Sequence, residues 1–483
     1  MWQCNNTKSG LSMLAFVALL FTVVCYAQPA TMSQVQLNIA QGKFIQAQQQ
    51  IEQLLPKADL ARKSQLQFEQ ERMRRILLDF PYTASQIKQQ IAQHIPSAST
   101  SEIALWTHDQ RLESMLIDNQ RRYFHRAVKN LFYIDAALLA RKNNATRLPT
   151  DSILYLANPL HTKWLNAVSE NTSSYLDPHT FKVNHQVTVN ADIVPAGEIV
   201  RAWIPYPREI AGQQQHIKLI RSNPDNAFVA PITALQRTVY LEQKAVKGNA
   251  TVFNIEYELT TQTLATRIDE QKINPIQRLN AELSDDLQER APHIIFTPEL
   301  RAFSKQIVGT ESNPYKITQK LFAAVSAKPW AVAREYSTLY NISNHALHSK
   351  HADCGEKTML LISLLRLNGI PAKWQSGWQL SPNGEFDSMH DWGTFYLAPY
   401  GWLPMDPTHG VLQSDNKLVQ WFYLGSLDGY RIAFNDEWGQ DFVPSKKFPR
   451  SETVDSQRGE VEWQGGNVYF DQWDYRVTWL QKN

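Results

Sequence analysis

The sequence contains little cysteine, no long run of like charge and few long apolar segments, and each shortage excludes a class of protein. Among 483 residues there are three cysteines, Cys4, Cys25 and Cys354, which are too few for a disulfide-stabilised fold. The net charge is +2 and neither sign is concentrated in one run, so we expect no nucleic acid partner. No segment after Val24 approaches the ~20 apolar residues that a membrane-spanning helix needs.

The overall composition is that of a folded protein with several domains. Hydrophobic residues make up 43% of the chain and charged residues 19%, which is typical of globular proteins. A chain of 483 residues is too long for one hydrophobic core and predicts several domains of about 100–200 residues each. We find no internal repeat.

The N-terminus has the pattern of a secretory signal. Lys8 precedes a mostly apolar stretch from Leu11 to Val24, and Ala27 closes a short segment suited to a signal peptidase. We therefore expect residues 1–27 to be removed near Ala27 and the mature chain to be periplasmic or extracellular, without an integral membrane segment. The alternative is an uncleaved N-terminal anchor. Cleavage leaves Cys354 as the single thiol, which must be buried or used in an oxidising compartment.

The hydrophobic periodicity divides the mature chain into regions of different character. Residues 28–180 show helical spacing, and residues 181–262 show period-two alternation, which predicts an antiparallel β-domain. A polar, proline-containing connection over 263–298 leads to alternating helices and strands over 299–430. The remaining residues, 431–483, contain an aromatic-rich hairpin with a Gly-Gly-Asn turn that we expect to pack on the core.

Cys354 begins the most strongly predicted helix. Residues 355–367 are rich in helix formers, and Asn368-Gly369 followed by Pro371 is a strong stop signal. A cysteine at a helix N-terminus is a candidate nucleophile, because the helix dipole and unpaired N–H groups favour a thiolate. Asp353 and Glu356 oppose ionisation, so the thiol also needs a basic partner.

His390 and Asp406 can supply the basic partner of the thiol and the carboxylate that orients it. The Ala-Pro-Tyr-Gly turn after Leu397 predicts a hairpin that brings His390 and Asp406 to the same end. An imidazole beside the thiol, oriented by a carboxylate, forms a nucleophile, base and orienter arrangement. The sequence therefore predicts a catalytic site of Cys354, His390 and Asp406.

These motifs resemble the transglutaminase-like superfamily, which is related to papain-type folds. The resemblance rests on "LLRLNGIPAKW", the His390-x-Trp392 strand and "GWLPMDPT", and the separations of Cys354, His390 and Asp406 are usual for that family. The closer similarity is to exported bacterial proteins that carry such a domain and also share "VRAWIPYPRE" and "RSETVDSQRGEVEW". It implies an α+β fold with a papain/transglutaminase-like catalytic core preceded by the helical region and the β-domain.

The resemblance also bears on the residues around the triad. Many relatives have His-Ala-Trp where this chain has His390-Asp391-Trp392, so Asp391 and Trp392 are candidates for a changed substrate wall. Trp330 is a candidate to support the developing oxyanion, with packing in the core as the other interpretation. We expect neither a metal nor a cofactor, because His351 and His409 lack the ligand spacing of a zinc site.

The function expected from these residues is cysteine-dependent acyl transfer on a protein, peptide or peptidoglycan amide. A thioester on Cys354 would pass to water or to an amine, and the sequence does not decide between the two. The other hypothesis is a non-catalytic envelope module that binds a partner on the same scaffold.

Overall fold

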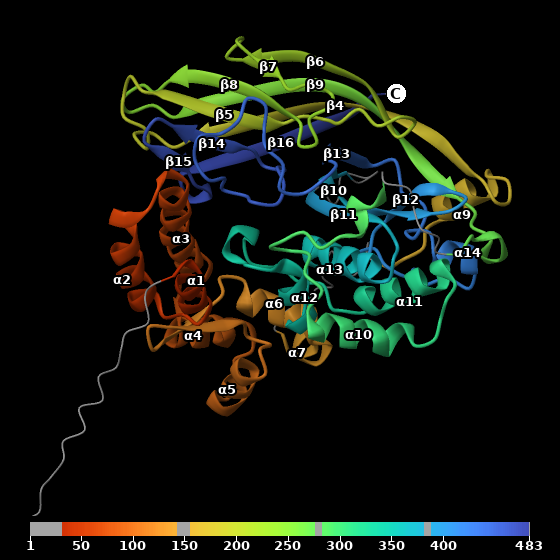
Figure 1. The fold of residues 1–483 in the computed structure, drawn as a ribbon, viewed down its shortest axis with the longest axis horizontal. Coiled ribbons are helices and arrows are strands. Elements are labelled where there is room, and N and C mark those ends of the chain that lie inside the picture. Colours follow the sequence, from red (N-terminus) through yellow and green to blue (C-terminus); the bar gives the residue numbers. More distant parts are fainter. Residues whose placement is uncertain (1–30, 143–154, 276–282, 381–387, 483) are drawn as a thin grey trace, which may run out of the picture.

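The computed structural model describes residues 31–142, 155–275, 283–380 and 388–482 and has helices and antiparallel sheets in separate layers (Figure 1). It is an α+β protein, as the sequence predicted. The predicted signal, residues 1–27, lies outside the described residues. Within the described ranges, no helix combines the length and apolarity required to cross a membrane.

The N-terminal region is mainly helical and has its own core. Its helices are α1 (Met32–Ala40), α2 (Phe44–Leu54), α3 (Leu60–Asp79), α4 (Ala84–His94), α5 (Thr100–His108), α6 (Ala127–Ile134) and α7 (Ala136–Arg141), with the short η1 (Leu55–Lys57). The next helix, α9 (Pro159–Asn166), packs instead in the core that carries Cys354, through Trp164 and Leu165. Capping boxes begin α4 at Thr83 and α5 at Ser99. A small sheet of β1 (Tyr82–Thr83), β2 (Ser114–Ile117) and β3 (Gln120–Tyr123) lies among these helices.

The next region is built from two antiparallel sheets packed face to face. Its strands are β4 (Ser173–Val189), β5 (Ile199–Pro205), β6 (Gln214–Asn223), β7 (Phe228–Val229), β8 (Thr238–Lys244) and β9 (Thr251–Thr266). Along β4, Phe181, Val183 and Val187 alternate with more exposed residues, which is why one face of the sheet is apolar. Figure 1 shows both sheets above the helices.

The core that carries Cys354 is a helical layer against a four-stranded sheet of order β12-β11-β10-β13. The sheet contains β10 (Ala372–Gln379), β11 (Ser388–Leu397), β12 (Gly401–Met405) and β13 (Arg431–Asn435), and the helices are α10 (Pro298–Val308), α11 (Pro314–Ser326), α12 (Ile342–His348), α13 (Cys354–Leu367) and α14 (Lys417–Gln420). Short 3-10 turns are η2 (Glu270–Lys272), η4 (Asp285–Leu287) and η5 (Tyr336–Thr338). α13 packs against β10 and β11, while Trp378 and Ile432 contact the β-domain core.

The C-terminal strands do not all belong to one region. β14 (Glu460–Trp463) and β15 (Gly466–Val468) form the hairpin, and β14 pairs with β5. After η6 (Phe470–Gln472), β16 (Trp473–Lys482) pairs with β4 from Val189 to Thr180. Residues 431–483, expected as an extension on the core, thus contribute β13 to the core sheet and β14–β16 to the sheets of the β-domain.

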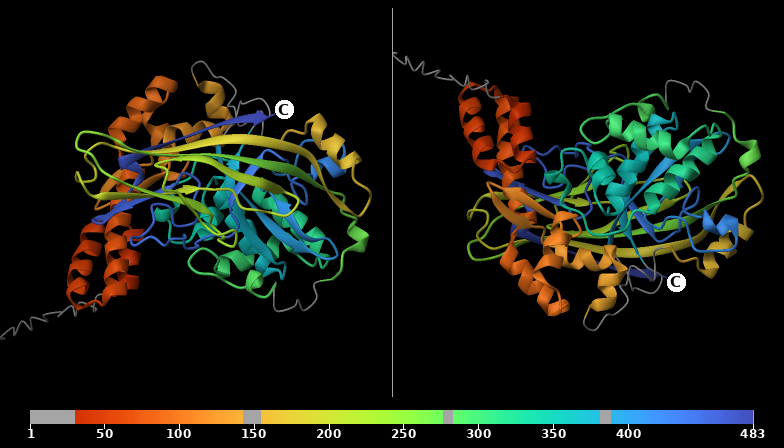
Figure 2. Two further views of the ribbon diagram at one scale, coloured as in Figure 1. Left: turned by 90° about the horizontal axis from the view of Figure 1, so that it is seen from above. Right: turned by 90° about the horizontal axis from the view of Figure 1, so that it is seen from below.

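Helix α3 connects the N-terminal region to two segments near the N-terminus of α13. Arg72 Nη1 donates to the carbonyl of Ser337 at 3.0 Å, and Arg75 Nη1 donates to the carbonyls of Arg450 and Ser451 at 3.0 and 3.1 Å. Both guanidinium groups are buried. Figure 2 shows α1–α3, in red, at one end of the molecule, and α3 reaches both segments through Arg72 and Arg75.

Candidate active site

Cys354 is the first residue of a helix whose start is fixed by its neighbour. The Asp353 carboxylate accepts the backbone N–H of Glu356 at 3.0 Å, and the Glu356 carboxylate accepts the N–H of Asp353, which closes a capping box. Nearly every residue of α13 is buried, so the helix is a central element of the core. His345 Nδ1 lies 2.5 Å from Glu356 Oε1 and offsets that buried charge.

His390 and Asp406 are brought together by the β11–β12 hairpin. Gly393 pairs with Met405, and Asp406 follows directly after β12. His390 Nε2 lies 2.8 Å from Asp406 Oδ2, and the N–H of Thr408 donates to Asp406 Oδ1 at 3.0 Å. Burial opposes ionisation of Asp406, but interaction with His390 and Arg431 outweighs it and holds the pKa of Asp406 well below its ordinary value.

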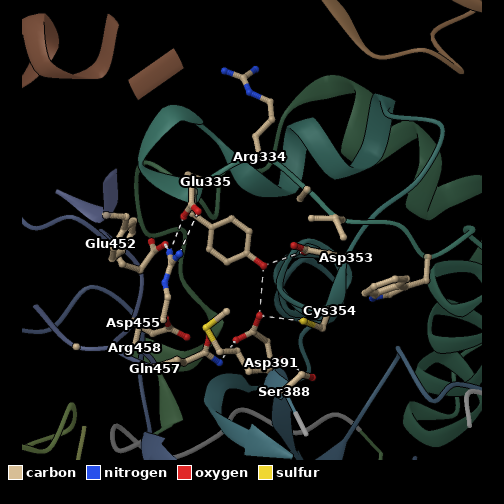
Figure 3. A pocket seen from close by; sticks show the side chains of 17 residues that line it. Arg334, Glu335, Asp353, Cys354, Ser388, Asp391, Glu452, Asp455, Gln457 and Arg458 are labelled. Carbon is tan, nitrogen blue, oxygen red and sulfur yellow. Dashed lines mark hydrogen bonds and ion pairs between the residues drawn. The ribbon is translucent and has the colours of Figure 1, made fainter. Parts of the chain in front are cut away.

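The thiol has a different hydrogen-bond partner. Cys354 Sγ donates to Asp391 Oδ2 at 3.2 Å (Figure 3), and among the described residues no hydrogen bond joins the thiol to His390. His390 and Asp391 are consecutive in a strand, so their side chains leave opposite faces of the sheet. Burial, followed by the charges of Asp391 and Asp353, raises the pKa of the Cys354 thiol well above its ordinary value.

A cavity of about 300 Å³ opens at the thiol. Its walls come from four parts of the chain, the segment before α12, the start of α13, the start of β11 and the C-terminal segment. They include Trp330, Glu335, Tyr336, Asp353, Cys354, Met389, Asp391, Glu452, Asp455, Gln457, Arg458 and Phe470. Arg458 forms a two-point ion pair with Glu335, at 3.1 and 2.6 Å. The other acidic residues of the wall, Asp353, Asp391, Glu452 and Asp455, are not paired with Arg458 in this way and give the cavity a lining rich in carboxyl groups.

The remaining predicted site residues are divided between the cavity and the core behind it. Trp330 and Asp391 line the cavity. Trp392 is fully buried, donates its indole N–H to Gln375 Oε1 and stacks on His390 with ring centroids 6.0 Å apart. Trp392 therefore supports the imidazole from the core side and does not belong to the described cavity wall.

The sequence analysis missed two buried cations close to the candidate triad. Arg431 Nη1 lies 2.8 Å from Asp406 Oδ2, and Arg431 also pairs with Asp428 at 3.0 Å. Lys357, on α13, donates to Tyr155 Oη at 3.1 Å and to the carbonyl of Ser326 at 3.2 Å. Burial lowers the pKa of Lys357 to about 7 against the effect of the Asp406 charge. A lone arginine or lysine in a strand or apolar helix gives no sequence signal of this role.

His390, Asp406 and His409 are close enough to be considered as metal ligands, because their ligand atoms lie within 4.8 Å of one another. The guanidinium of Arg431 and the imidazole of His390 both contact Asp406 Oδ2. The positive charge of Arg431 opposes binding of a metal cation at this oxygen. His409 is also hydrogen-bonded through Nε2 to Gln379. We therefore assign this cluster to orientation of His390 and not to a metal.

One comparison, with models of protein families, agrees with the family suggested by the motifs. Residues 301–407 match the transglutaminase-like superfamily. A candidate cysteine protease from Cytophaga hutchinsonii is 14% identical, with 64% of this chain and 93% of that one covered and a TM-score of 0.42. The periplasmic domain of TgpA from Pseudomonas aeruginosa is 15% identical, with coverages of 55% and 94% and a TM-score of 0.25.

No curated protein gave a significant match to the chain. The family assignment therefore rests on the match over residues 301–407, which contains Cys354, His390 and Asp406. This part of the chain is a transglutaminase-like domain.

Proposed function

We propose that the chain is a cysteine-dependent acyl-transfer enzyme of the bacterial cell envelope that acts through Cys354, His390 and Asp406. The observation that supports this best is the position of Cys354 at the start of α13, open to a cavity and beside the strand that carries His390 paired with Asp406. A nucleophile, a base and an orienter then come from one helix and one hairpin.

The proposed reaction begins with a change of partner for the thiol. Because the side chains of Asp391 and His390 leave opposite faces of β11, the thiol reaches the imidazole only after this end of the strand rearranges. The S–H proton then passes from its contact with Asp391 to Nδ1 of His390, while Nε2–H stays hydrogen-bonded to the ionised Asp406. The thiolate attacks an amide carbonyl, His390 returns the proton to the leaving amine, and a thioester remains on Cys354. Water or a second amine then releases the acyl group, so the same intermediate serves an amide hydrolase, a peptidase or a transglutaminase.

The walls of the cavity suit this chemistry. The backbone N–H of Cys354 is a candidate oxyanion donor, and Trp330 lies in the cavity wall as a candidate support. Protein glutamine, peptide and peptidoglycan amides are all candidate substrates. The mechanism itself requires neither a metal nor a cofactor, because the carbonyl is attacked by a protein thiol and protons move through His390.

Capture of the thioester tests the proposal directly. The mature chain would be incubated with glutamine-containing protein or with peptidoglycan stem peptides in the presence of hydroxylamine, which converts a thioester into a hydroxamate. We expect hydroxamate from the unmodified chain and about 10²–10⁴-fold less from His390→Ala. Cys354→Ser should give none. An unmodified chain that forms no more hydroxamate near neutral pH than His390→Ala would refute the enzyme proposal.

The hydrogen bond from Cys354 to Asp391 favours a second candidate function. A buried thiol whose pKa is raised is a poor nucleophile, and a domain held in this state could act as a non-catalytic envelope binding module. Cys354→Ser separates the two candidates in cells. If the cellular phenotype is kept in Cys354→Ser, the function is binding. If it is lost, the function depends on the chemistry of the Cys354 thiol.

A further inference from the structure

The carboxyl group of Asp391 is the centre of the contacts around the thiol. Its Oδ2 accepts from Cys354 Sγ at 3.2 Å and lies 3.2 Å from Tyr336 Oη, which also donates to Asp353 at 2.8 Å. Its Oδ1 accepts from Gln457 Nε2 at 2.9 Å. Asp391 is 2% exposed, so these contacts set the orientation of its carboxyl plane.

Gln457 comes from the C-terminal segment, outside the residues that match the superfamily. Its amide also donates to the carbonyl of His390 at 2.9 Å and of Gly377 at 3.1 Å, so one side chain joins β10, β11 and Asp391. The carbonyl of Gln457 in turn accepts the indole N–H of Trp378 at 2.9 Å. Hydrogen bonds therefore hold both the side-chain amide and the backbone carbonyl of Gln457. The amide contacts β11, the strand that carries His390 and Asp391.

We propose that Gln457 is a positioning residue that fixes Asp391 against Cys354, and that Asp391 thereby keeps the sulfur in the thiol form and away from His390. The C-terminal segment then belongs to the site and holds it in a resting state. The role of this contact in catalysis rests on the proposed function, whereas the protonation state of the Cys354 thiol can be measured without a substrate.

The ionisable groups around the thiol mostly favour its protonated form. The capping carboxylate of Asp353 does so, the amine of Lys357 on the same helix opposes it, and η5 contributes the phenol of Tyr336. β11 contributes Asp391, and the C-terminal segment contributes Asp455, which shares a hydrogen bond with Asp391. Burial, together with Asp455 and Asp353, raises the pKa of Asp391 well above its ordinary value.

The pH dependence of Cys354 alkylation tests the proposal. Rates with iodoacetamide would be measured from pH 5 to 10 on the mature chain, in which Cys354 is the one thiol. We expect Asp391→Ala to move the midpoint down by about one pH unit or more, which is about tenfold faster alkylation at neutral pH. Gln457→Leu should move it in the same direction by less, and Gln464→Leu, at an exposed turn, should not move it.

The variants must be shown to be folded, by an unchanged circular dichroism spectrum and a cooperative thermal transition. An unchanged midpoint in folded Asp391→Ala would overturn the role of Asp391. A shift in Asp391→Ala with none in Gln457→Leu would overturn the role of Gln457. Both results are independent of hydroxamate formation, so this inference and the proposed function can fail separately.

Discussion

His390 and Arg431 share one oxygen of the same carboxylate, because His390 Nε2 and Arg431 Nη1 each lie 2.8 Å from Asp406 Oδ2. Asp406 is fully buried, so the two contacts compensate its charge and fix its plane. The arrangement makes Asp406 an ionised orienter whose position depends on a residue from β13. The geometry around Asp406 therefore connects the hairpin to the edge of the core sheet.

Replacing Arg431 should be strongly destabilising. Arg431→Met removes the guanidinium from the buried carboxylates of Asp406 and Asp428, and loss of one member of a buried ion pair costs about 3–5 kcal/mol. Urea denaturation would measure the loss. Arg221→Met is the matched control, because Arg221 pairs with Glu256 at the surface, is 69% exposed and should change stability by less than about 1 kcal/mol. Equal effects of the two changes would contradict the prediction.

Stability should fall as the pH rises from about 4 towards 7. Burial raises the pKa of Asp79 to about 7, so between these two values the folded chain keeps a proton there that the unfolded chain has lost. The contribution is fully present below the ordinary carboxyl pKa of about 4, falls by up to about 1.4 kcal/mol per pH unit, and is gone once the pH has passed the folded pKa. Thermal transitions across this range would measure the fall, and Asp79→Asn should make it shallower. An equally steep fall in the variant would assign the effect to other carboxyls.

Arg75 should control the order of the C-terminal wall of the cavity. Arg75→Met removes the donors to the carbonyls of Arg450 and Ser451 and the contact of the guanidinium with the Tyr469 ring, at 4.3 Å. We expect a loss of about 1–3 kcal/mol and faster hydrogen exchange in the segment that follows Ser451.

Arg62→Met is the control for Arg75→Met. Arg62 lies on the same helix, α3, and its side chain is exposed. Its replacement should leave exchange beyond Ser451 unchanged. Similar exchange in the two variants would show that α3 does not organise this wall.

Gly355 is required for the contacts that surround the thiol. A Cβ at this position would lie 2.1 Å from Tyr336 Oη and 2.7 Å from Asp391 Oδ2. Gly355→Ala should therefore displace both groups, cost about 1–3 kcal/mol and change the alkylation rate of Cys354. Mass spectrometry of alkylated protein would follow the rate, and an unchanged rate with unchanged stability would contradict the prediction.

The sequence allowed the main architecture to be predicted because the signals were local. The run of helix formers after Cys354 and the stop at Asn368-Gly369 predicted α13, and the motifs around His390 and Asp406 predicted the superfamily, which the match over residues 301–407 confirms. Period-two alternation predicted strands such as β4 and β9. The assignment of Cys354, His390 and Asp406 as catalytic stays a prediction.

Contacts between distant segments could not be predicted in this way. The choice of Asp391 over His390 as the hydrogen-bond partner of the thiol depends on which face of β11 meets α13, and alternation alone does not say which face that is. Gln457 and Arg431 contact the candidate site only after β10 has paired with both β11 and β13. Their roles follow from the tertiary fold and have no local signature.

The pairing of β16 with β4 has a consequence for how the chain folds. β4 begins the β-domain, yet one of its edges is covered only by Trp473–Lys482, the last strand described. Until synthesis of the chain has delivered those residues, β4 presents an open row of backbone donors and acceptors that can pair with another molecule. Because of this strand order, we expect the β-domain to fold late and chains truncated near the C-terminus to aggregate.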